Sequence, residues 1–123
     1  MKYITNVCGD IDISGLAKPQ KLEIRRLLEE FYTVQEMGDV FSDEKVTIND
    51  EWSEFNESDK FLSCMFKVTK LLPKETEYLI MCNGERDGDI WGIILKNNKV
   101  YTQRYELKPE GDTQEYEKVR FKK

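Results

Sequence analysis

The strongest constraint on the fold is a change in the spacing of apolar residues along the chain. Residues 3–14 alternate, with Ile11 and Ile13 set between polar neighbours, which is typical of a strand with one buried and one wet face. After Pro19 the apolar side chains recur three or four residues apart, as on one face of a helix. They are Ile24, Leu27, Leu28, Phe31 and Val34. We therefore predict a helix that begins near Pro19 and ends just before Gly38.

The middle of the chain predicts a short strand and a second helix. Residues 45–49 alternate apolar and polar side chains, as a half-buried strand does. Ser58 is placed to cap a helix that Pro73 would end. The apolar residues of this stretch recur at helical spacing: Phe61, Leu62, Met65, Phe66, Val68 and Leu72. A strand over residues 62–68 stays open as an alternative, because residues 66–69 also alternate.

The last third of the chain predicts an antiparallel meander. Four segments have the composition of strands: 78–82, 89–95, 99–107 and 116–121. Turn residues separate them, at 85–88, Asn97–Asn98 and 109–112. The basic residues near the C-terminus would discourage unwanted pairing of an edge strand there.

The order of these elements predicts an α+β fold. We expect a mostly antiparallel β-sheet of about five to six strands with two helices packed on one face. The chain of 123 residues has no internal repeat and no linker-like segment. That length fits a single compact domain over residues 1–123.

The absence of histidine and the net charge of −5 exclude several classes of function. Without histidine, the usual Ser-His-Asp and Cys-His nucleophiles and most zinc sites are ruled out. An acidic chain is poorly suited to direct nucleic-acid binding, which needs lysine and arginine to displace counterions from phosphates. Residues 82–88 hold two glycines but lack the Gly-Lys-Ser/Thr ending of a phosphate-binding loop. We therefore expect no enzymatic activity, no cofactor and no metal site.

A metal-dependent enzyme is the least favoured alternative. Asp10 and Asp12 lie two apart in a predicted strand, and Asp87 and Asp89 flank a glycine. Residues two apart share one face of a strand, so each pair would suit a hard cation such as Mg²⁺.

The chain has the character of a cytoplasmic protein. No apolar run approaches the roughly 18 residues that suggest a membrane span, and the N-terminus lacks the apolar segment of a signal peptide. The chain has an odd number of cysteines, and they are widely spaced: Cys8, Cys64 and Cys82. This indicates small apolar side chains in a reducing compartment rather than disulfides. We expect no membrane partner, and the oligomeric state stays open.

The densest acidic stretch lies between residues 39 and 59, where eight carboxylates stand against one base, Lys45. Acidic side chains among large aromatic ones are suited to contact a basic protein surface. We predict a partner-binding patch made of Asp50, Glu51, Trp52, Glu54, Phe55 and Glu57. If the segment is helical, Trp52 and Phe55 share one face. The alternative is that both rings pack into the domain and the carboxylates only face water.

A second candidate site lies on the predicted meander. Trp91 is followed by apolar residues, so core packing is its simplest role. Alternatively, Trp91 stacks on a nucleotide-like anion that Arg86, Arg104 and Tyr105 help to hold. This arrangement would make the protein a small-molecule-binding, sequestering module.

Small size, dense surface charge and one acidic–aromatic patch favour a non-enzymatic binding protein that masks a basic surface of a macromolecular partner. This profile is similar to that of inhibitors of host defence encoded by phages and mobile elements, including some anti-CRISPR proteins. The resemblance implies that carboxylates would occupy positions normally taken by phosphates on a nucleic-acid-binding protein. Binding of this kind weakens with salt.

Overall fold

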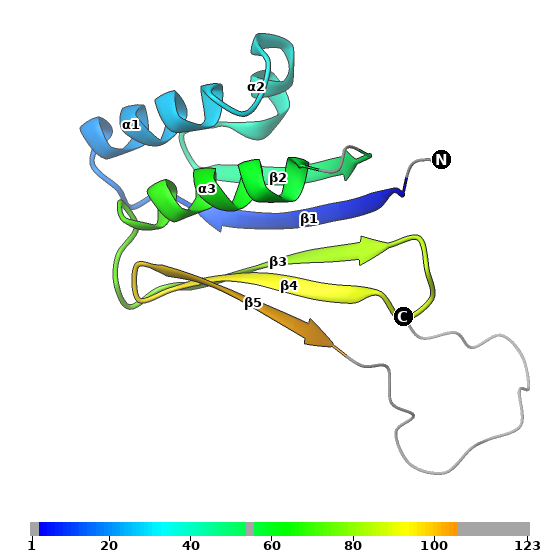
Figure 1. Cartoon of the computed structure of the whole chain (residues 1–123). Helices are drawn as coiled ribbons and strands as arrows, with labels where there is room; N and C mark the ends of the chain where they lie inside the picture. Colours follow the sequence, from blue (N-terminus) through cyan, green and yellow to red (C-terminus); the bar gives the residue numbers. More distant parts are fainter. Residues whose placement is uncertain (1–2, 54–55, 106–123) are drawn as a thin grey trace, which may run out of the picture.

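Five strands pair in the order β2-β1-β3-β4-β5, and every neighbouring pair is antiparallel (Figure 1). The computed structural model describes residues 3–53 and 56–105. Its elements are β1 (Thr5–Asp12), α1 (Lys18–Glu29), α2 (Val34–Val40), β2 (Lys45–Trp52), α3 (Glu57–Thr69), β3 (Glu77–Gly84), β4 (Ile90–Lys96) and β5 (Lys99–Tyr105). The predicted strand over 116–121 lies outside the described residues.

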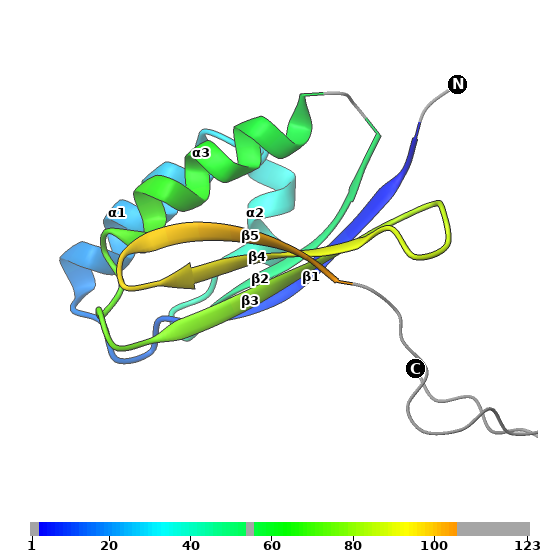
Figure 2. The same cartoon turned by 60° about the horizontal axis from the view of Figure 1, so that its bottom comes forward.

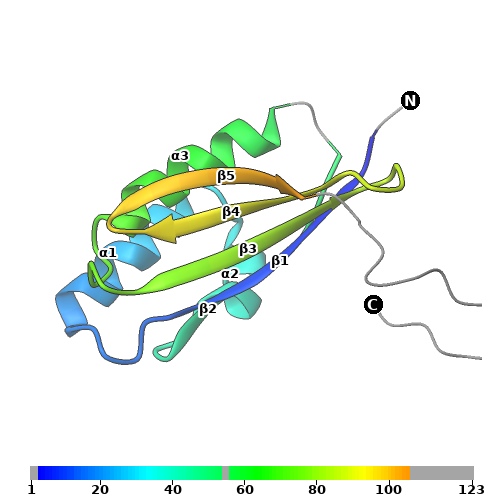
Figure 3. The same ribbon diagram turned by 90° about the horizontal axis from the view of Figure 1, so that it is seen from below.

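The helices lie on one side of the sheet and leave the other side open (Figures 2 and 3). Alternate residues of each inner strand point toward the helices, and these are the fully buried ones, such as Ile11, Ile48 and Ile80. The predicted α+β sheet with helices on one face is therefore confirmed. The sequence predicted two helices, whereas the described chain forms three.

The third helix arises because the first one ends early. α1 ends at Glu29, and α2 begins after Thr33, whose hydroxyl accepts a hydrogen bond from the Glu36 N–H at 3.2 Å. In return the Glu36 carboxylate accepts from the Thr33 N–H at 2.8 Å, which completes a capping box. Val34 is 91% exposed at the start of α2 and is not part of the buried stripe. Gly38 lies inside α2 and does not mark the end of the first helix.

The predicted second helix is confirmed as α3, and the strand alternative for its middle is wrong. The residue at its N-cap is Asn56, so Ser58 lies inside the helix and does not cap it. Phe61, Met65 and Val68 are buried as the spacing predicts, while Phe66 is 54% exposed.

A tight turn joins β4 to β5 and also contacts α3. Asn97 and Asn98 both have positive φ, at 55° and 60°, as the favoured two-residue hairpin requires. The predicted turn is therefore confirmed. The Asn98 side-chain N–H₂ donates to the carbonyl oxygens of Thr69 at 2.7 Å and Leu72 at 2.8 Å. Thr69 is the last residue of α3 and Leu72 lies just beyond it, so the turn is tied to the C-terminal end of the helix.

Four aromatic rings form a row from the connection between α1 and α2 to β4. The Phe31 and Phe61 centroids are 5.5 Å apart, and Phe61 lies 5.3 Å from Trp52. Trp52 in turn lies 6.4 Å from Trp91. Such offset and edge contacts add to the free energy gained by burying the rings. Across the described ranges 3–53 and 56–105, no helix is both long and apolar enough to span a bilayer.

Candidate functional site

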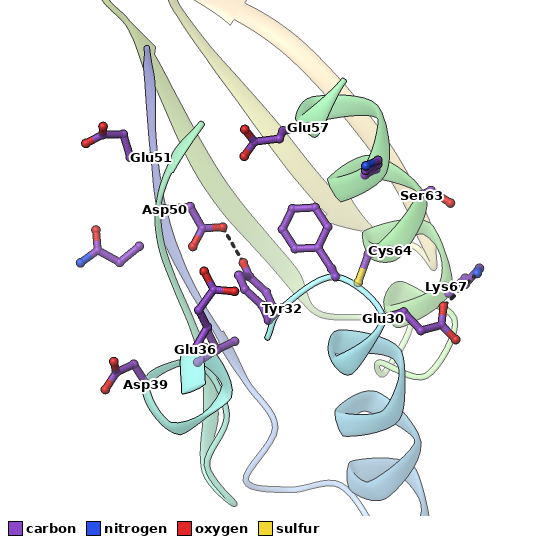
Figure 4. Close-up of a pocket in the computed structure, with 14 residues that line it drawn as sticks. Glu30, Tyr32, Glu36, Asp39, Asp50, Glu51, Glu57, Ser63, Cys64 and Lys67 are labelled. Carbon is purple, nitrogen blue, oxygen red and sulfur yellow. Dashed lines mark hydrogen bonds and ion pairs between the residues drawn. The ribbon is translucent and has the colours of Figure 1, made fainter. Parts of the chain in front are cut away.

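An acidic groove of about 620 Å³ lies between α2, β2 and α3 (Figure 4). Phe31 and Tyr32, from the connection between α1 and α2, lie between its two walls. Its charged lining consists of six carboxylates and two lysines: Glu30, Glu36, Asp39, Asp50, Glu51, Glu57, Lys60 and Lys67. The groove therefore carries a clear excess of negative charge.

Asp50 is a half-buried carboxylate that is held by a tyrosine. It lies on the inward face of β2, in step with Val46, Ile48 and Trp52. The hydroxyl of the buried Tyr32 donates to Asp50 Oδ2 at 2.6 Å. Burial raises the pKa of Asp50, and the hydrogen bond from Tyr32 opposes this rise. Burial, together with the neighbouring carboxylate, also raises the pKa of the Tyr32 phenol, so it stays protonated and donates.

Trp52 is 4% exposed, so it does not lie on the surface as the predicted acidic–aromatic patch requires. The cause is that β2 continues to Trp52, and its alternation turns this ring inward against Phe61. The helix considered as one possibility for this segment therefore does not form at residues 50–52, which belong to β2. The indole Nε1 is buried without a hydrogen-bond partner among the described residues. It faces Asp50 closely enough to favour the charged carboxylate, but does not reach ordinary hydrogen-bond geometry.

Three residues of the predicted patch do meet in the groove. Asp50, Glu51 and Glu57 all line it, from β2 and the start of α3. Glu57 also accepts a hydrogen bond from the Ser53 N–H at 3.1 Å, which ties the end of β2 to α3. The other two members, Glu54 and Phe55, lie outside the described residues.

The two lysines occupy the α3 wall. Lys67 Nζ lies 3.5 Å from Glu30 Oε1, so its charge is balanced within the groove. Lys60 is exposed near the first turns of the helix. Both lysines lie on the wall opposite β2 and α2, where Glu36, Asp39 and Asp50 gather, so the β2 side is the more acidic.

Sequence reasoning missed the part of the groove that α1 and α2 supply. Glu30, Tyr32 and Glu36 fall within the single helix that the sequence predicts, and Asp39 begins the acidic stretch but is not a member of the predicted patch. The motif Thr33-x-x-Glu36 is a capping-box signature that would have shown a second helix starting there. That start turns Glu36 and Asp39 toward β2.

The four residues of the alternative ligand site around Trp91 are only partly brought together. Trp91 and Arg104 lie directly opposite each other on β4 and β5, but Tyr105 follows Arg104 and therefore points to the other face. Its ring lies beside Gly92 on that face, where a Cβ would come within 3.0 Å of it. Arg86 lies near Arg104 at the same end of the sheet, because its N–H donates to the Tyr3 hydroxyl at 3.1 Å and its guanidinium lies 5.6 Å from the Tyr3 ring centroid.

The cation of Arg104 is already engaged by Asp89, which also accepts a hydrogen bond from the Tyr3 hydroxyl at 2.5 Å. These contacts, led by that of Tyr3, lower the pKa of Asp89. Gly84 borders this cluster, because a Cβ at this position would clash with Asp89 Oδ2. The charge of Arg104 is thus balanced by a carboxylate of its own chain.

The acidic pairs considered for a cation are also accounted for. Asp12 accepts hydrogen bonds from the N–H and hydroxyl of Ser14, at 2.9 and 2.7 Å, and these lower its pKa. Asp89 is engaged as described above. In the part of the chain that the structure describes, no three cysteine or acidic side chains converge as a metal site.

Comparison with known proteins adds no functional information. A scan against protein-family models finds no match, and neither the curated proteins nor the solved structures contain a significant match to this chain.

Proposed function

We propose that the protein is a non-enzymatic binding protein whose acidic groove receives a basic segment of a macromolecular partner. One observation carries this proposal: six carboxylates line the groove, against two lysines, of which Lys67 is paired with Glu30. Single exposed ion pairs contribute little, about 0–1 kcal/mol each. Several carboxylates around one concave surface act together on a partner that brings several positive charges.

The proposal modifies the patch expected from the sequence. The contact surface is a groove with carboxylates on its walls rather than exposed aromatic rings. Phe31 and the ring of Tyr32 supply the apolar part of its lining, on which the stems of lysine and arginine side chains pack well.

As the biological setting of such a groove we propose an inhibitor that is encoded by a phage or a mobile element. This inhibitor would cover a basic nucleic-acid channel. The setting includes a cytoplasmic location and a nucleic-acid-binding protein as partner. The support is chemical, because a surface that binds phosphates also binds carboxylates at similar spacing.

The proposal is tested by charge reversal at two groove positions. Asp39 and Glu51 are exposed, line the groove, and make no side-chain hydrogen bond or ion pair with a described residue. The double variant Asp39→Lys/Glu51→Lys should therefore fold normally. The matched control is Asp43→Lys/Glu75→Lys, which reverses two exposed carboxylates that do not line the groove and changes the net charge equally.

Each protein is immobilised and used to capture partners from lysate at about 50 and 300 mM salt. A partner held by the wild type and the control, lost with the groove variant and released by salt, supports the proposal. Capture that is the same for all three proteins would contradict it.

A further inference from the structure

The strand that forms one wall of the groove is at the edge of the sheet. β2 pairs with β1 along its whole length, and its other side meets only an isolated bridge between Phe41 and Val46. Past that bridge, no described strand pairs with the outer side of β2. An edge strand presents backbone donors and acceptors that an added strand can use.

The groove follows this edge. Three successive residues, Asn49, Asp50 and Glu51, all line the same cavity. Successive side chains of a strand point to opposite faces, so one cavity can touch all three only by running along the backbone edge. In Figure 4 the labelled Asp50 and Glu51 side chains point to opposite sides of the β2 ribbon.

The backbone of Glu51 points out of the sheet. The Lys45 carbonyl accepts from the Ser42 N–H at 3.1 Å, outside the sheet, and the Ser53 N–H donates to Glu57. In an antiparallel pair, the residues that bond to the partner strand alternate with those that do not. By this alternation Asn49 and Glu51 also direct their N–H and C=O groups to the outer edge. Apart from the pairing of β1 with β2, no described residue hydrogen-bonds to the backbone of Glu51.

We propose that the groove binds an extended, lysine- or arginine-bearing segment of a partner protein as an added strand on the outer edge of β2. This inference rests on the proposed function and names the form its partner takes. Residues 49–52 offer about 10 Å of edge, at roughly 3.3 Å per residue. Main-chain hydrogen bonds would hold the segment, and alternate side chains would reach the carboxylates of the groove.

Charge favours a basic partner over a second copy of this chain. Pairing of two β2 edges would bring the acidic groove of one molecule against that of the other. Like charges opposite one another destabilise a strand pair. A segment with positive side chains at every second position meets no such repulsion.

The test uses an end-blocked, fluorescent peptide of alternating lysine and threonine, nine residues long and beginning with lysine. Two further peptides carry backbone N-methyl groups, one at every lysine and the other at every threonine. In an added strand only one of these two sets of N–H groups faces β2. We expect one methylated peptide to bind the full-length protein at least tenfold more weakly than the parent, and the other to bind within about twofold of it.

Protein variants separate edge pairing from charge. Glu51→Pro removes an outward N–H at an edge position, where proline is tolerated in strands, and Glu51→Gln removes only the charge. Glu51→Pro should weaken binding of the parent peptide beyond the effect of Glu51→Gln.

Equal binding of both methylated peptides, with groove dependence retained, would overturn strand addition and leave the proposed function standing. No groove-dependent binding by any peptide would overturn both.

Two other occupants of the groove would each give a different result. A wild-type dimer in light scattering that Glu51→Pro dissolves would assign the edge to a second copy. A chain ending at Tyr105 loses five acids and five bases, so its net charge is unchanged. Tenfold tighter peptide binding by that chain would assign the groove to residues 106–123 instead.

Discussion

Replacing Tyr32 with phenylalanine removes one hydroxyl and keeps the buried ring. The ring stays in edge-to-face contact with Phe31, whose centroid is 4.8 Å away. What is lost is the 2.6 Å hydrogen bond to Asp50. A hydrogen bond to a charged group contributes about 1.5–3 kcal/mol, against about 0.5–1.5 kcal/mol for a neutral pair. We expect Tyr32→Phe to lower the free energy of unfolding by about 2 kcal/mol at pH 7, or roughly 5–10 °C in Tm.

This cost should depend on pH through Asp50. Burial raises the folded-state pKa of Asp50 above its usual 3.8, so its contribution to stability is complete below that value. The contribution is then lost as the pH rises through the raised pKa. Because Tyr32 restrains the rise, Tyr32→Phe should make this loss larger. The variant should therefore be closest to the wild type under acidic conditions.

Urea unfolding, followed by tryptophan fluorescence at pH 7 and near pH 3.5, measures both effects. Asp50→Asn supplies the control, since an amide oxygen still accepts from Tyr32 but does not ionise. In that background Tyr32→Phe should cost only about 1 kcal/mol at either pH. An equal cost in both backgrounds and at both pH values would refute a charged hydrogen bond between Tyr32 and Asp50.

Three further outcomes follow from the packing. Phe61→Ala should lower the unfolding free energy by about 3–5 kcal/mol in urea titrations, because a fully buried ring leaves a cavity. Gly9→Ala should cost about 1–3 kcal/mol by thermal unfolding, since its new Cβ would lie 2.9 Å from backbone atoms of Leu79 and Ile80; an unchanged Tm would contradict this close approach. A thiol reagent at pH 8 should modify only Cys8 in the folded protein, because it is the exposed thiol and burial raises the pKa of the other two to about 11 and about 12. Rapid modification of more than one thiol would show that the core opens easily.

Most of the fold follows from local patterns that a sequence displays directly. The alternation around Ile11 and the helical spacing around Met65 each have one face that must be buried, so they predict their elements well. The paired asparagines at 97 and 98 identify their turn because few residues accept positive φ.

The candidate site was harder to predict because it depends on where elements end. The apolar spacing to Val34 continues through the true end of α1, so the periodic pattern concealed the capping box at Thr33. The acidic composition after Asn49 concealed the continuation of β2 to Trp52. That continuation decides which side chains face inward, since one step along a strand reverses the face. Composition thus located the acidic segment, while the exposure of each member depended on strand register.

The contacts of Asn98 join two parts of the chain that are distant in sequence. Its amide donates to the carbonyl of Thr69, the last residue of α3, and to that of Leu72 just beyond it, and its backbone forms the bend between β4 and β5. The helix end cannot fray without releasing that bend, so the two should behave as one cooperative opening unit in hydrogen exchange. Opening motions of the β4–β5 hairpin would then be transmitted along α3 to its first turn, which lines the groove.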